Sequence, residues 1–461
     1  MKVYLDTMGC QMNVLDSELV AAMLSAAGMT LTDDARDADV LLYNTCSVRQ
    51  HAEDKVHSRL GWACRRKADG ARLIVGVLGC MAQRLGEALL RRHKGLDIVC
   101  SPGQLARLPE LIAAAGEAAQ SAGRCAVALD PPRSAGDGDR TLDDALDAMR
   151  DTAATHRPGQ AYVRIMRGCD KFCAYCVVPT VRGPERSRRP ESIVEEVRRL
   201  VGAGVTQVTL LGQTVNAYRW AAGATTVGLA DLLGRLDGIA GLRRLRFVTS
   251  YPAGFDRAIL QAMRDLPSVC EYLHVPAQSG SDRILRAMNR RYTRAEYDAL
   301  IDEARAAVPG IAVAGDFIVG FPSETEADHA ASADLIRRSG YKNAYVFKYS
   351  PRPDTLAARR GDDDVPDATK RRRNNELLAV QNDVSLAGNR GWIGRTVEVL
   401  VEGPAPRPPR AGQGHRLVGR TRTDHIVAFD GPAELAGRYV QVQIADATAL
   451  ALLGRRMTGD D

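Results

Sequence analysis

Residues 162–188 read YVRIMRGCDKFCAYCVVPTVRGPERSR, a strand-like run that passes directly into a loop with three cysteines. Cys169, Cys173 and Cys176 have the spacing CxxxCxxC, which allows three thiolates to surround one metal centre. Structural zinc sites and ferredoxin-type clusters use a fourth ligand, but Val177-Val178-Pro179 follows here. We therefore favour a four-iron cluster with one open iron over a zinc site or chance cysteines.

Outward from this stretch, strand signals recur with helical patterns between them. The six strand-like segments are 162–166, 207–211, 245–249, 272–275, 311–319 and 344–349. Consecutive βα units of this kind predict a partial (β/α)6 barrel, in which functional residues lie on the loops that follow the strands. The cysteine loop follows the first of these strands.

The first hundred residues show the same alternation. Strand-like runs at 3–5, 40–43 and 73–78 alternate with helices, one of them expected over 16–27 with Asp16 as its cap. A cysteine follows each strand within a few residues: Cys10, Cys46 and Cys80. Because ligands collect beyond the carboxyl ends of parallel strands, we expect these thiols to converge, although each alone could be a buried small hydrophobic residue.

Two further regions complete the expected organisation. Small residues and prolines over 117–154 predict a linker with one short helix near 141–149, and β-rich runs at 396–401, 425–429 and 439–444 predict a small β-barrel. We thus expect an α/β chain with three domains. They are an amino-terminal parallel α/β domain at 1–116, a partial barrel at 155–386 and the small β-barrel at 389–457.

The composition limits the functional classes. With 461 residues, 45% hydrophobic and 26% charged, the chain is not disordered, and it has no apolar run long enough for a membrane helix. Asp6 stands where a signal peptide needs its apolar run, so we expect a cytoplasmic protein. In that compartment ten cysteines favour metal or redox chemistry over disulfides.

The motifs are similar to those of a known family. CxxxCxxC resembles the radical S-adenosylmethionine (SAM) motif, and the whole 162–188 string resembles the methylthiotransferases. Other stretches match motifs of that family in the expected order: TMGCQMN at 7–13, NTCSVR at 44–49, GC at 79–80, LLGQTVN at 210–216, QSGSD at 278–282, DFIVGFP at 316–322 and LVGRT at 417–421, the last in the family's TRAM domain. The resemblance covers nearly the whole chain.

The resemblance implies two [4Fe-4S] clusters. Cys169, Cys173 and Cys176 would hold the cluster that cleaves SAM to a 5′-deoxyadenosyl radical, and Cys10, Cys46 and Cys80 would hold an auxiliary cluster. It also implies two SAM per turnover. One methylates a sulfur on the auxiliary cluster, and the other activates an adenine C2–H bond that acids and bases cannot readily break. No catalytic residue is expected beyond the clusters.

The polar residues near the strand ends are candidates for binding SAM. These are Gln213, Asn216, Ser279 and Asp316. Each could equally be a turn or capping residue.

Basic residues indicate the substrate. Seven Lys/Arg against two acids lie within 161–190, and a second basic cluster, with His415 and His425, lies in the small barrel. The candidate RNA contacts are Arg182, Arg186, Arg188, Arg416, Arg420 and Arg422. The alternative is a solvated basic rim. A tRNA anticodon stem-loop, whose single-stranded bases can be splayed into a pocket, is the expected partner.

The stretches MRGCDKF and VVP most resemble the family branch that converts N6-isopentenyladenosine next to the anticodon (position 37) to its 2-methylthio derivative. Other branches act on N6-threonylcarbamoyladenosine or on an aspartate of a ribosomal protein. A non-catalytic iron–sulfur or zinc RNA-binding protein is the alternative from another class. We also expect a flavodoxin- or ferredoxin-like electron donor, a sulfur or cluster supplier, no membrane partner and a monomer.

Overall fold

The computed structural model describes residues 1–47, 50–118, 125–131, 140–151, 157–223, 225–405 and 416–457. The chain forms two compact units. Unit 1 comprises residues 1–156, 166–172 and 176–186, and unit 2 comprises residues 157–165, 173–175 and 187–461. No helix in the described ranges has the length and apolar character that a membrane crossing requires.

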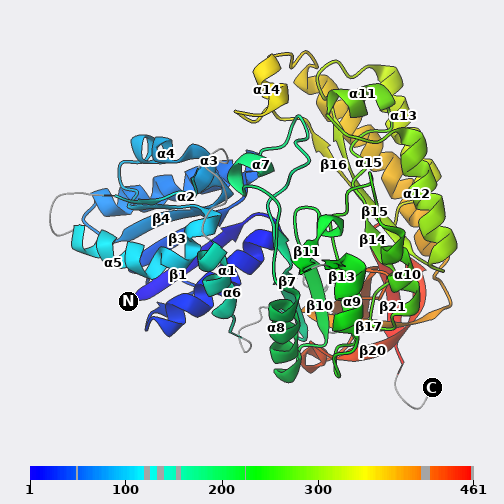
Figure 1. The fold of residues 1–461 in the computed structure, drawn as a ribbon, viewed down its shortest axis with the longest axis horizontal. Helices are drawn as coiled ribbons and strands as arrows, with labels where there is room; N and C mark the ends of the chain where they lie inside the picture. The colour runs from blue at the N-terminus through cyan, green and yellow to red at the C-terminus, as the bar shows by residue number, and fades with distance from the viewer. Residues whose placement is uncertain are drawn as a thin grey trace. The chain divides into compact units, whose positions relative to one another are not determined.

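Unit 1 is built on a six-stranded parallel sheet with the order β2-β1-β3-β4-β5-β6 (Figure 1). Its strands are β1 (Lys2–Met8), β2 (Thr30–Leu31), β3 (Val40–Thr45), β4 (Ile74–Gly79), β5 (Ile98–Cys100) and β6 (Ala126–Ala128). Its helices are α1 (Gln11–Ala26), α2 (Gln50–Ala68), α3 (Cys80–Leu85), α4 (Glu87–Arg92), η1 (Pro102–Arg107), α5 (Leu108–Ala118), α6 (Arg140–Ala148) and α7 (Val178–Val181). Two short strands, β8 (Met166–Arg167) and β9 (Arg186–Ser187), pair with each other.

The central strands of this sheet are covered on both faces. β3 and β4 are buried at every position, as their uninterrupted apolar runs predict for a parallel sheet between two helical layers. On one face Tyr43, Val75 and Val77 pack with Val56 and Leu60 of α2. Helices α1 and α5 also contact this sheet.

The region expected as a linker contributes to this sheet. β6 pairs with β5 in parallel, with Ile98 opposite Ala126, and the expected short helix is present as α6. The two or three residues of β2, β5 and β6 carry no periodic pattern that distinguishes them from the adjoining loops, so these strands were not predicted. The helix expected over 16–27 begins earlier, at Gln11, so Asp16 lies inside α1 and is not its cap.

Unit 2 contains the partial barrel. Its parallel strands form two three-stranded sheets with the orders β13-β10-β7 and β14-β15-β16. The strands are β7 (Gln160–Arg164), β10 (Gln207–Leu211), β13 (Arg244–Phe247), β14 (Tyr272–His274), β15 (Ala312–Val319) and β16 (Asn343–Lys348). The helices are α8 (Pro190–Gly202), η3 (Val215–Ala217), α9 (Leu229–Asp237), α10 (Arg257–Asp265), α11 (Asp282–Ala287), α12 (Arg294–Ala307), α13 (Glu326–Ser339), α14 (Leu356–Arg360) and α15 (Asp367–Arg390). All six strands lie close to their predicted positions.

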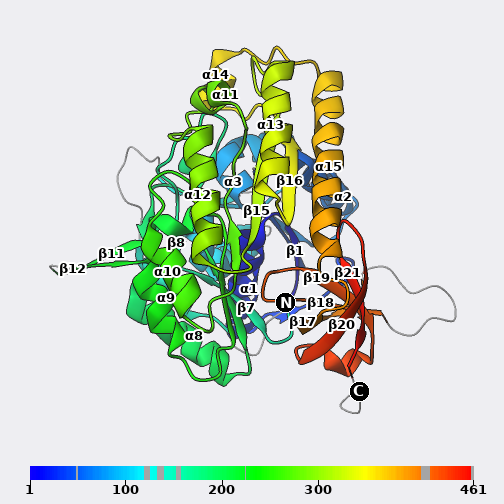
Figure 2. The same ribbon diagram turned by 90° about the vertical axis from the view of Figure 1, so that its right-hand side faces the viewer.

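Helices cover one face of this partial barrel at β15 and β16 (Figure 2). α12, α13 and α15 run side by side beyond β15 and β16 (Figure 2). Along β15, Phe317 and Val319 are buried, whereas Asp316 and Ile318, on the opposite face, are half-buried. An antiparallel hairpin, β11 (Arg219–Ala222) with β12 (Thr225–Gly228), is inserted after β10.

A closed five-stranded barrel ends the chain, with the order β17-β18-β19-β21-β20. It consists of β17 (Thr396–Pro404), β18 (Arg416–Arg420), β19 (Ile426–Asp430), η4 (Ala433–Leu435), β20 (Tyr439–Ala447) and β21 (Leu452–Arg456). Arg244 of β13 anchors it to the partial barrel, donating to the Arg420 carbonyl O at 2.7 Å and to the Glu398 carboxylate at 2.9 Å. The expected small barrel is present, with β18 and β21 in addition to the predicted strands.

Candidate metal centre

The three cysteines of the amino-terminal sheet lie beyond the carboxyl ends of neighbouring strands. Met8 of β1, Thr45 of β3 and Gly79 of β4 stand in one register row. The cysteines that follow this row by one or two residues are Cys10, Cys46 and Cys80. Cys46 and Cys80 are each 3% exposed. Because the three strands end in the same register row, the backbones of the three cysteines lie at one edge of the sheet.

An asparagine pair braces this edge. Asn13 Nδ2 donates to Asn44 Oδ1 at 3.1 Å, and Asn44 Nδ2 donates to the Asn13 carbonyl O at 3.0 Å. Asn13 Oδ1 also accepts from the Cys10 N–H at 3.3 Å and from its thiol at 3.2 Å. A Cβ at Gly9 or Gly79 would collide with the amide oxygen of Asn13 or Asn44, respectively. The pair therefore requires glycine beside two of the cysteines.

A buried arginine reaches the same edge from a segment far along the chain. Arg182, directly after α7, donates from Nε to Cys80 Sγ at 3.2 Å and from Nη2 to Asp16 Oδ2 at 2.8 Å. The Arg182 side chain is 2% exposed and the Asp16 side chain 0%. Nη1 of Arg182 is buried as well, and it has no hydrogen-bond partner within the described part of the chain. Since a buried donor without an acceptor is costly, this atom indicates that an acceptor belongs beside it.

The thiols and this arginine shift one another's protonation. A hydrogen bond with Cys46 and the charge of Arg182 lower the pKa of the Cys10 thiol to about 6, although burial opposes them. Burial raises the pKa of the Cys80 thiol, against the effect of Arg182. Despite burial, Cys80 and Asp16 raise the pKa of the Arg182 guanidinium well above its ordinary value. The thiolate is the form of cysteine that binds metals, so this environment favours metal ligation at Cys10, whereas burial opposes the thiolate at Cys80.

The donor set fits a three-cysteine iron–sulfur cluster. The Cys80 thiol contacts a permanent cation that has one unused N–H donor, and hydrogen bonds to sulfur are a common feature around such clusters. Among the described residues, no three or more His, Cys, Asp and Glu side chains are grouped as ligands of a single metal ion.

The second cysteine motif begins in a loop held by its neighbours in unit 1. The Cys169 N–H donates to the Gly183 carbonyl O at 3.2 Å. Asp170 and Glu185 exchange two hydrogen bonds, each from a backbone N–H to the other's carboxylate, at 3.2 and 3.3 Å. Gly168 has φ +80°, and a Cβ there would collide with the backbone that faces it. The loop therefore depends on glycine at this position.

Cys173 lies in unit 2, where a second buried arginine contacts its sulfur. Arg290 donates from Nη1 to Cys173 Sγ at 3.3 Å. The next residue, Ala174, is fully buried; its N–H donates to the Met288 carbonyl O at 2.8 Å, and its carbonyl accepts from the Ala357 N–H at 2.7 Å. These two hydrogen bonds of Ala174 therefore hold the backbone next to Cys173 in place.

Asp16 and Arg290 were not among the predicted site residues. The signal for Asp16 was an acid between Leu15 and Leu19, which are both 1% exposed, on the buried face of α1. A buried acid of this kind requires a partner, here Arg182. Arg290 lies in none of the motifs identified in the sequence, so no sequence feature indicated that it belongs to the site.

Two of the SAM candidates make hydrogen bonds to the backbone. Asn216 donates to the Tyr251 carbonyl O and accepts from the Tyr251 N–H, both at 2.8 Å. Ser279 is 1% exposed, and its Oγ accepts from the Ser281 N–H at 3.2 Å. Their assignment to SAM stays a prediction. Ser279 makes a local contact of the turn type, whereas Asn216 joins two segments that are 35 residues apart in the sequence.

The other two SAM candidates are half-buried at strand ends. Gln213 follows β10, and Asp316 lies on the half-buried face of β15. Asp316 Oδ1 is 3.4 Å from Nε2 of His274, on the neighbouring strand β14. Gln213 and Asp316 are therefore better placed for a polar ligand than Asn216 and Ser279, whose side chains bond to the backbone.

Most of the predicted RNA-contact arginines have acidic partners. These partners are Asp16 for Arg182, Glu196 for Arg188 (2.8 Å), Glu402 and Asp424 for Arg420 (3.1 and 3.0 Å), and Glu271 for Arg422 (2.8 Å). Arg186 is half-buried on β9, and Arg416 is exposed at the start of β18. Because phosphates would compete with these acids, Arg416 is the candidate best placed for RNA. His425 is 8% exposed, and His415 lies outside the described residues.

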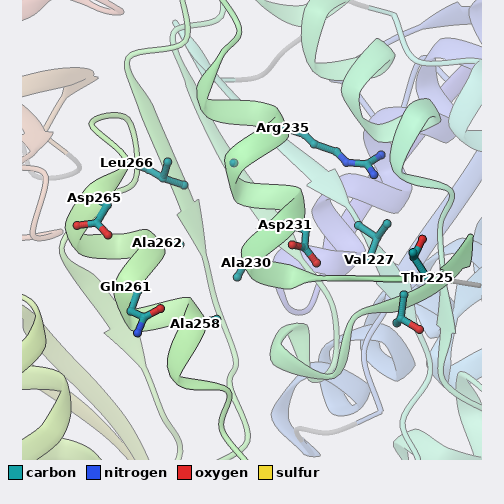
Figure 3. Close-up of a pocket in the computed structure, with 12 residues that line it drawn as sticks. Thr225, Val227, Ala230, Asp231, Arg235, Ala258, Gln261, Ala262, Asp265 and Leu266 are labelled. Atoms are coloured by element: carbon teal, nitrogen blue, oxygen red, sulfur yellow. The ribbon is translucent and has the colours of Figure 1, made fainter.

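A separate groove in unit 2 has no cysteine among its described lining residues. It has a volume of about 730 Å³ and lies between the hairpin strand β12, α9 and α10, with Asp231, Arg235, Gln261 and Asp265 in its walls (Figure 3). None of the described residues that line it is a predicted site residue.

Comparisons with known proteins agree with this architecture. Residues 2–101 match the family described as Uncharacterized protein family UPF0004, residues 163–336 match the Radical SAM superfamily, and residues 392–455 match the TRAM domain. Among solved structures, the chain is similar to the radical SAM methyltransferase TsrM from Kitasatospora setae, with cobalamin and a [4Fe-4S] cluster bound. The TM-score is 0.53 at 16% identity, covering 77% of this chain and 76% of that one. This likeness shows a shared fold.

Curated relatives match almost from end to end. The chain is 46% identical to tRNA-2-methylthio-N(6)-dimethylallyladenosine synthase of Rhodopirellula baltica, over 99% of this chain and 95% of the relative. It is 41% identical to the protein of the same name from Moorella thermoacetica, over 98% of both chains. The order of the three matched domains and this extent of identity lead to one assignment: the chain belongs to the methylthiotransferase family of radical SAM enzymes.

Proposed function

We propose that the chain is a tRNA methylthiotransferase that converts N6-isopentenyladenosine next to the anticodon to its 2-methylthio derivative. The observation that carries this proposal is the 46% identity, over nearly the full length, to a relative named for that product. Relatives from Porphyromonas gingivalis and Moorella thermoacetica have the same name. These names favour the isopentenyl branch over the threonylcarbamoyl and ribosomal-protein branches.

The proposed cofactors are SAM and two [4Fe-4S] clusters. The proposed ligands are Cys169, Cys173 and Cys176 for one cluster and Cys10, Cys46 and Cys80 for the other. When bound, these groups supply the reductive cleavage of SAM and the sulfur that is transferred, with two SAM consumed per turnover.

The residues of the chain provide position and exclusion of water. Asn13 and Asn44 fix the strand ends that carry the amino-terminal thiols. Val177 and Val181 pack on Cys80 and keep that thiol dry. Asp316 is proposed to bind the amino group of SAM as a carboxylate, with Gln213 as a neutral hydrogen-bonding partner.

The proposed partners follow from the same assignment. A tRNA anticodon stem-loop would contact the TRAM barrel, where Arg416 is exposed, and phosphate contacts of this kind orient RNA without reading its sequence. A flavodoxin- or ferredoxin-like protein would supply the electron, and a separate protein would supply sulfur or clusters. We propose that the protein acts as a cytoplasmic monomer.

Mass spectrometry of nucleosides tests the function. The reconstituted protein receives SAM and a strong reductant without oxygen, and in parallel tRNA that carries either the isopentenyl or the threonylcarbamoyl nucleoside. We expect the 2-methylthio product from the isopentenyl tRNA alone. Product from the other tRNA would correct the branch. Intact SAM, with a full complement of iron, would contradict the enzymatic assignment itself.

Cysteine variants separate the two proposed clusters. Cys173→Ala is expected to abolish SAM cleavage, because the remaining thiols cannot hold the cluster. Cys46→Ala is expected to preserve cleavage, measured as 5′-deoxyadenosine, and to abolish the methylthio product. A Cys46→Ala protein that still inserts sulfur would contradict the auxiliary cluster.

A further inference from the structure

The amino-terminal thiol site contains a cation that the family motifs did not predict for it. Arg182 uses two of its three nitrogen atoms in the structure, Nε toward Cys80 Sγ and Nη2 toward Asp16. The third, Nη1, is buried and has no acceptor among the described residues. Planar guanidinium groups are oriented by paired hydrogen bonds, so the two bonds that are made determine where Nη1 points.

Burial restricts what can satisfy this donor. Arg182 is 4% exposed and Asp16 is 0% exposed, so a phosphate group in solvent has no access to the guanidinium without opening the site. The neighbouring group is instead a thiol: Cys80 lies at hydrogen-bond distance, and Cys10 and Cys46 follow the adjacent strand ends of the same sheet. A sulfur atom of a cluster bound by these thiols would lie in the same buried site and could accept the hydrogen bond of Arg182 Nη1.

We propose that Arg182 is a positioning residue of the auxiliary cluster, to which its Nη1 donates a hydrogen bond while Asp16 fixes the guanidinium. This rests on the proposed function in one respect, that Cys10, Cys46 and Cys80 hold a cluster. It replaces the role in RNA binding that the basic segment suggested for Arg182.

The pair has a predictable electrostatic consequence. Hydrogen bonds to sulfur and nearby charge are among the factors that set the reduction potential of an iron–sulfur cluster. The Arg182 cation stabilises the reduced, more negative cluster, whereas the Asp16 carboxylate opposes it. Removal of the arginine charge is therefore expected to lower the reduction potential, and removal of the carboxylate charge is expected to raise it. Loss of a purely structural brace gives no such pair of opposite shifts.

The test uses the full-length chain with Cys169, Cys173 and Cys176 replaced by Ala, so that only the auxiliary cluster is loaded. Into this protein we introduce Arg182→Gln, Arg182→Lys or Asp16→Asn. Iron and sulfide content, the electron paramagnetic resonance spectrum of the reduced protein and its reduction potential are measured without oxygen. Arg150→Gln is the matched control. Arg150 forms an ion pair with the buried Glu18, which lies on α1 as Asp16 does, and its Nη2 is 3.0 Å from Glu18 Oε2.

We expect Arg182→Gln to lower the potential and alter the spectrum, and Asp16→Asn to raise the potential. Arg182→Lys keeps the charge without the paired geometry and should lie between Gln and the parent; it also replaces Gln if that variant does not load iron. The control should keep the parent spectrum. Shifts of the same sign, or unchanged spectra and potentials at full iron content, would overturn the proposal. If the parent protein, in which Cys169, Cys173 and Cys176 are replaced, loads no cluster, the two-cluster assignment fails, and this proposal fails with it.

Discussion

Arg290 donates a hydrogen bond from Nη1 to the Sγ of Cys173 at 3.3 Å, and its other two nitrogen atoms donate to uncharged groups. Its Nη2 donates to the Pro276 carbonyl O at 3.0 Å, and its Nε donates to the Tyr292 hydroxyl at 2.9 Å. The ring of Tyr251 lies 4.4 Å from its central carbon. Each of the two cysteine motifs therefore has one buried arginine on a thiol.

The two arginines differ in how their charge is balanced. Arg182 faces the carboxylate of Asp16, whereas Arg290 is held by a carbonyl, a hydroxyl and aromatic faces. Cation–π contacts and directional bonds of this type suit a guanidinium better than an ammonium. Arginine at position 290 is therefore expected to be needed for its shape as well as for its charge.

Arg290→Lys is predicted to keep the protein folded but to impair SAM cleavage. The ammonium of lysine cannot make the three directed bonds, so the Cys173 thiol loses its fixed position, and misplacement of this order costs roughly 10–100-fold in rate. The measurement is the rate of 5′-deoxyadenosine formation at equal iron content. Arg291→Lys is the control, because this neighbour is exposed. Equal rates for the two variants would show that Arg290 acts only through its charge.

Gly168→Ala is predicted to be far more damaging than Gly183→Ala. Both glycines have left-handed backbone angles, with φ +80° and +75°, which cost an alanine about 1–2 kcal/mol. At Gly168 the added Cβ would also collide with the Pro184 carbonyl, whereas at Gly183 the nearest atom belongs to Arg186 at 3.8 Å. The loop before Cys169 must therefore move only in the first variant.

Urea denaturation of the metal-free proteins and iron content after reconstitution measure this difference. We expect Gly183→Ala to lose about 1–2 kcal/mol and to load iron normally. Gly168→Ala should lose more stability and bind less iron. Similar losses for both variants would mean that the contact at residue 184 relaxes without cost.

Arg422→Ala and Arg416→Ala are predicted to affect different properties. Arg422 donates to the Glu271 carboxylate at 2.8 Å and to the Val269 carbonyl O at 2.7 Å, so it joins the small barrel to the partial barrel. Its removal should cost roughly 1–3 kcal/mol, because it leaves partly buried acceptors unsatisfied. Arg416 is exposed, and its removal should leave stability within about 0.5 kcal/mol of the parent.

RNA affinity measured over tenfold steps in salt concentration distinguishes a phosphate contact at Arg416 from a structural role of Arg422. Loss of one phosphate contact at Arg416 should reduce the slope of log affinity against log salt by about 1. Arg422→Ala should leave this slope unchanged. A changed slope for Arg422→Ala with unchanged stability would restore the role that the basic cluster in the sequence suggested for it.

The sequence was sufficient to locate the strand ends that carry the cysteines. Long buried strands such as β3 and β4 have strong apolar patterns, and a cysteine directly after such a strand must lie at the sheet edge. β6 has three residues and lies within the expected linker, so its pairing with β5 depends on tertiary contacts alone. Local pattern therefore predicted the long elements but missed several short strands, β6 among them.

Charge was harder to interpret than hydrophobic pattern. A cluster of arginines in the sequence has the same appearance whether it faces RNA or its own acids, and the acids of Arg182 and Arg422 are 166 and 151 residues away. Asp16 looked like a helix cap because caps favour aspartate, yet α1 begins at Gln11. Partners so distant in the sequence become visible only once the fold brings them together.

His425 is predicted to make the small barrel less stable in mild acid. Burial lowers the pKa of His425 to about 3; Lys342 adds to this effect, and Asp424 opposes it. Its Nδ1 lies 2.8 Å from the Thr423 hydroxyl, and its ring lies 5.0 Å from that of Trp392. The folded protein therefore holds the imidazole neutral at pH values where the unfolded chain, with an ordinary pKa of 6.5, protonates it.

Because the unfolded state binds the additional proton, stability falls as the pH decreases from about 6.5 toward 3, and it is constant with respect to this group above 6.5. At pH 5 the expected loss is on the order of 2 kcal/mol relative to pH 7.5. Trp62→Phe and Trp220→Phe leave Trp392, beside His425, as the fluorescent reporter of urea unfolding. His425→Gln in this protein should abolish the loss between the two pH values. If the Gln variant loses as much stability as its parent, the pH dependence arises from other groups, and His425 is protonated without cost in the folded barrel.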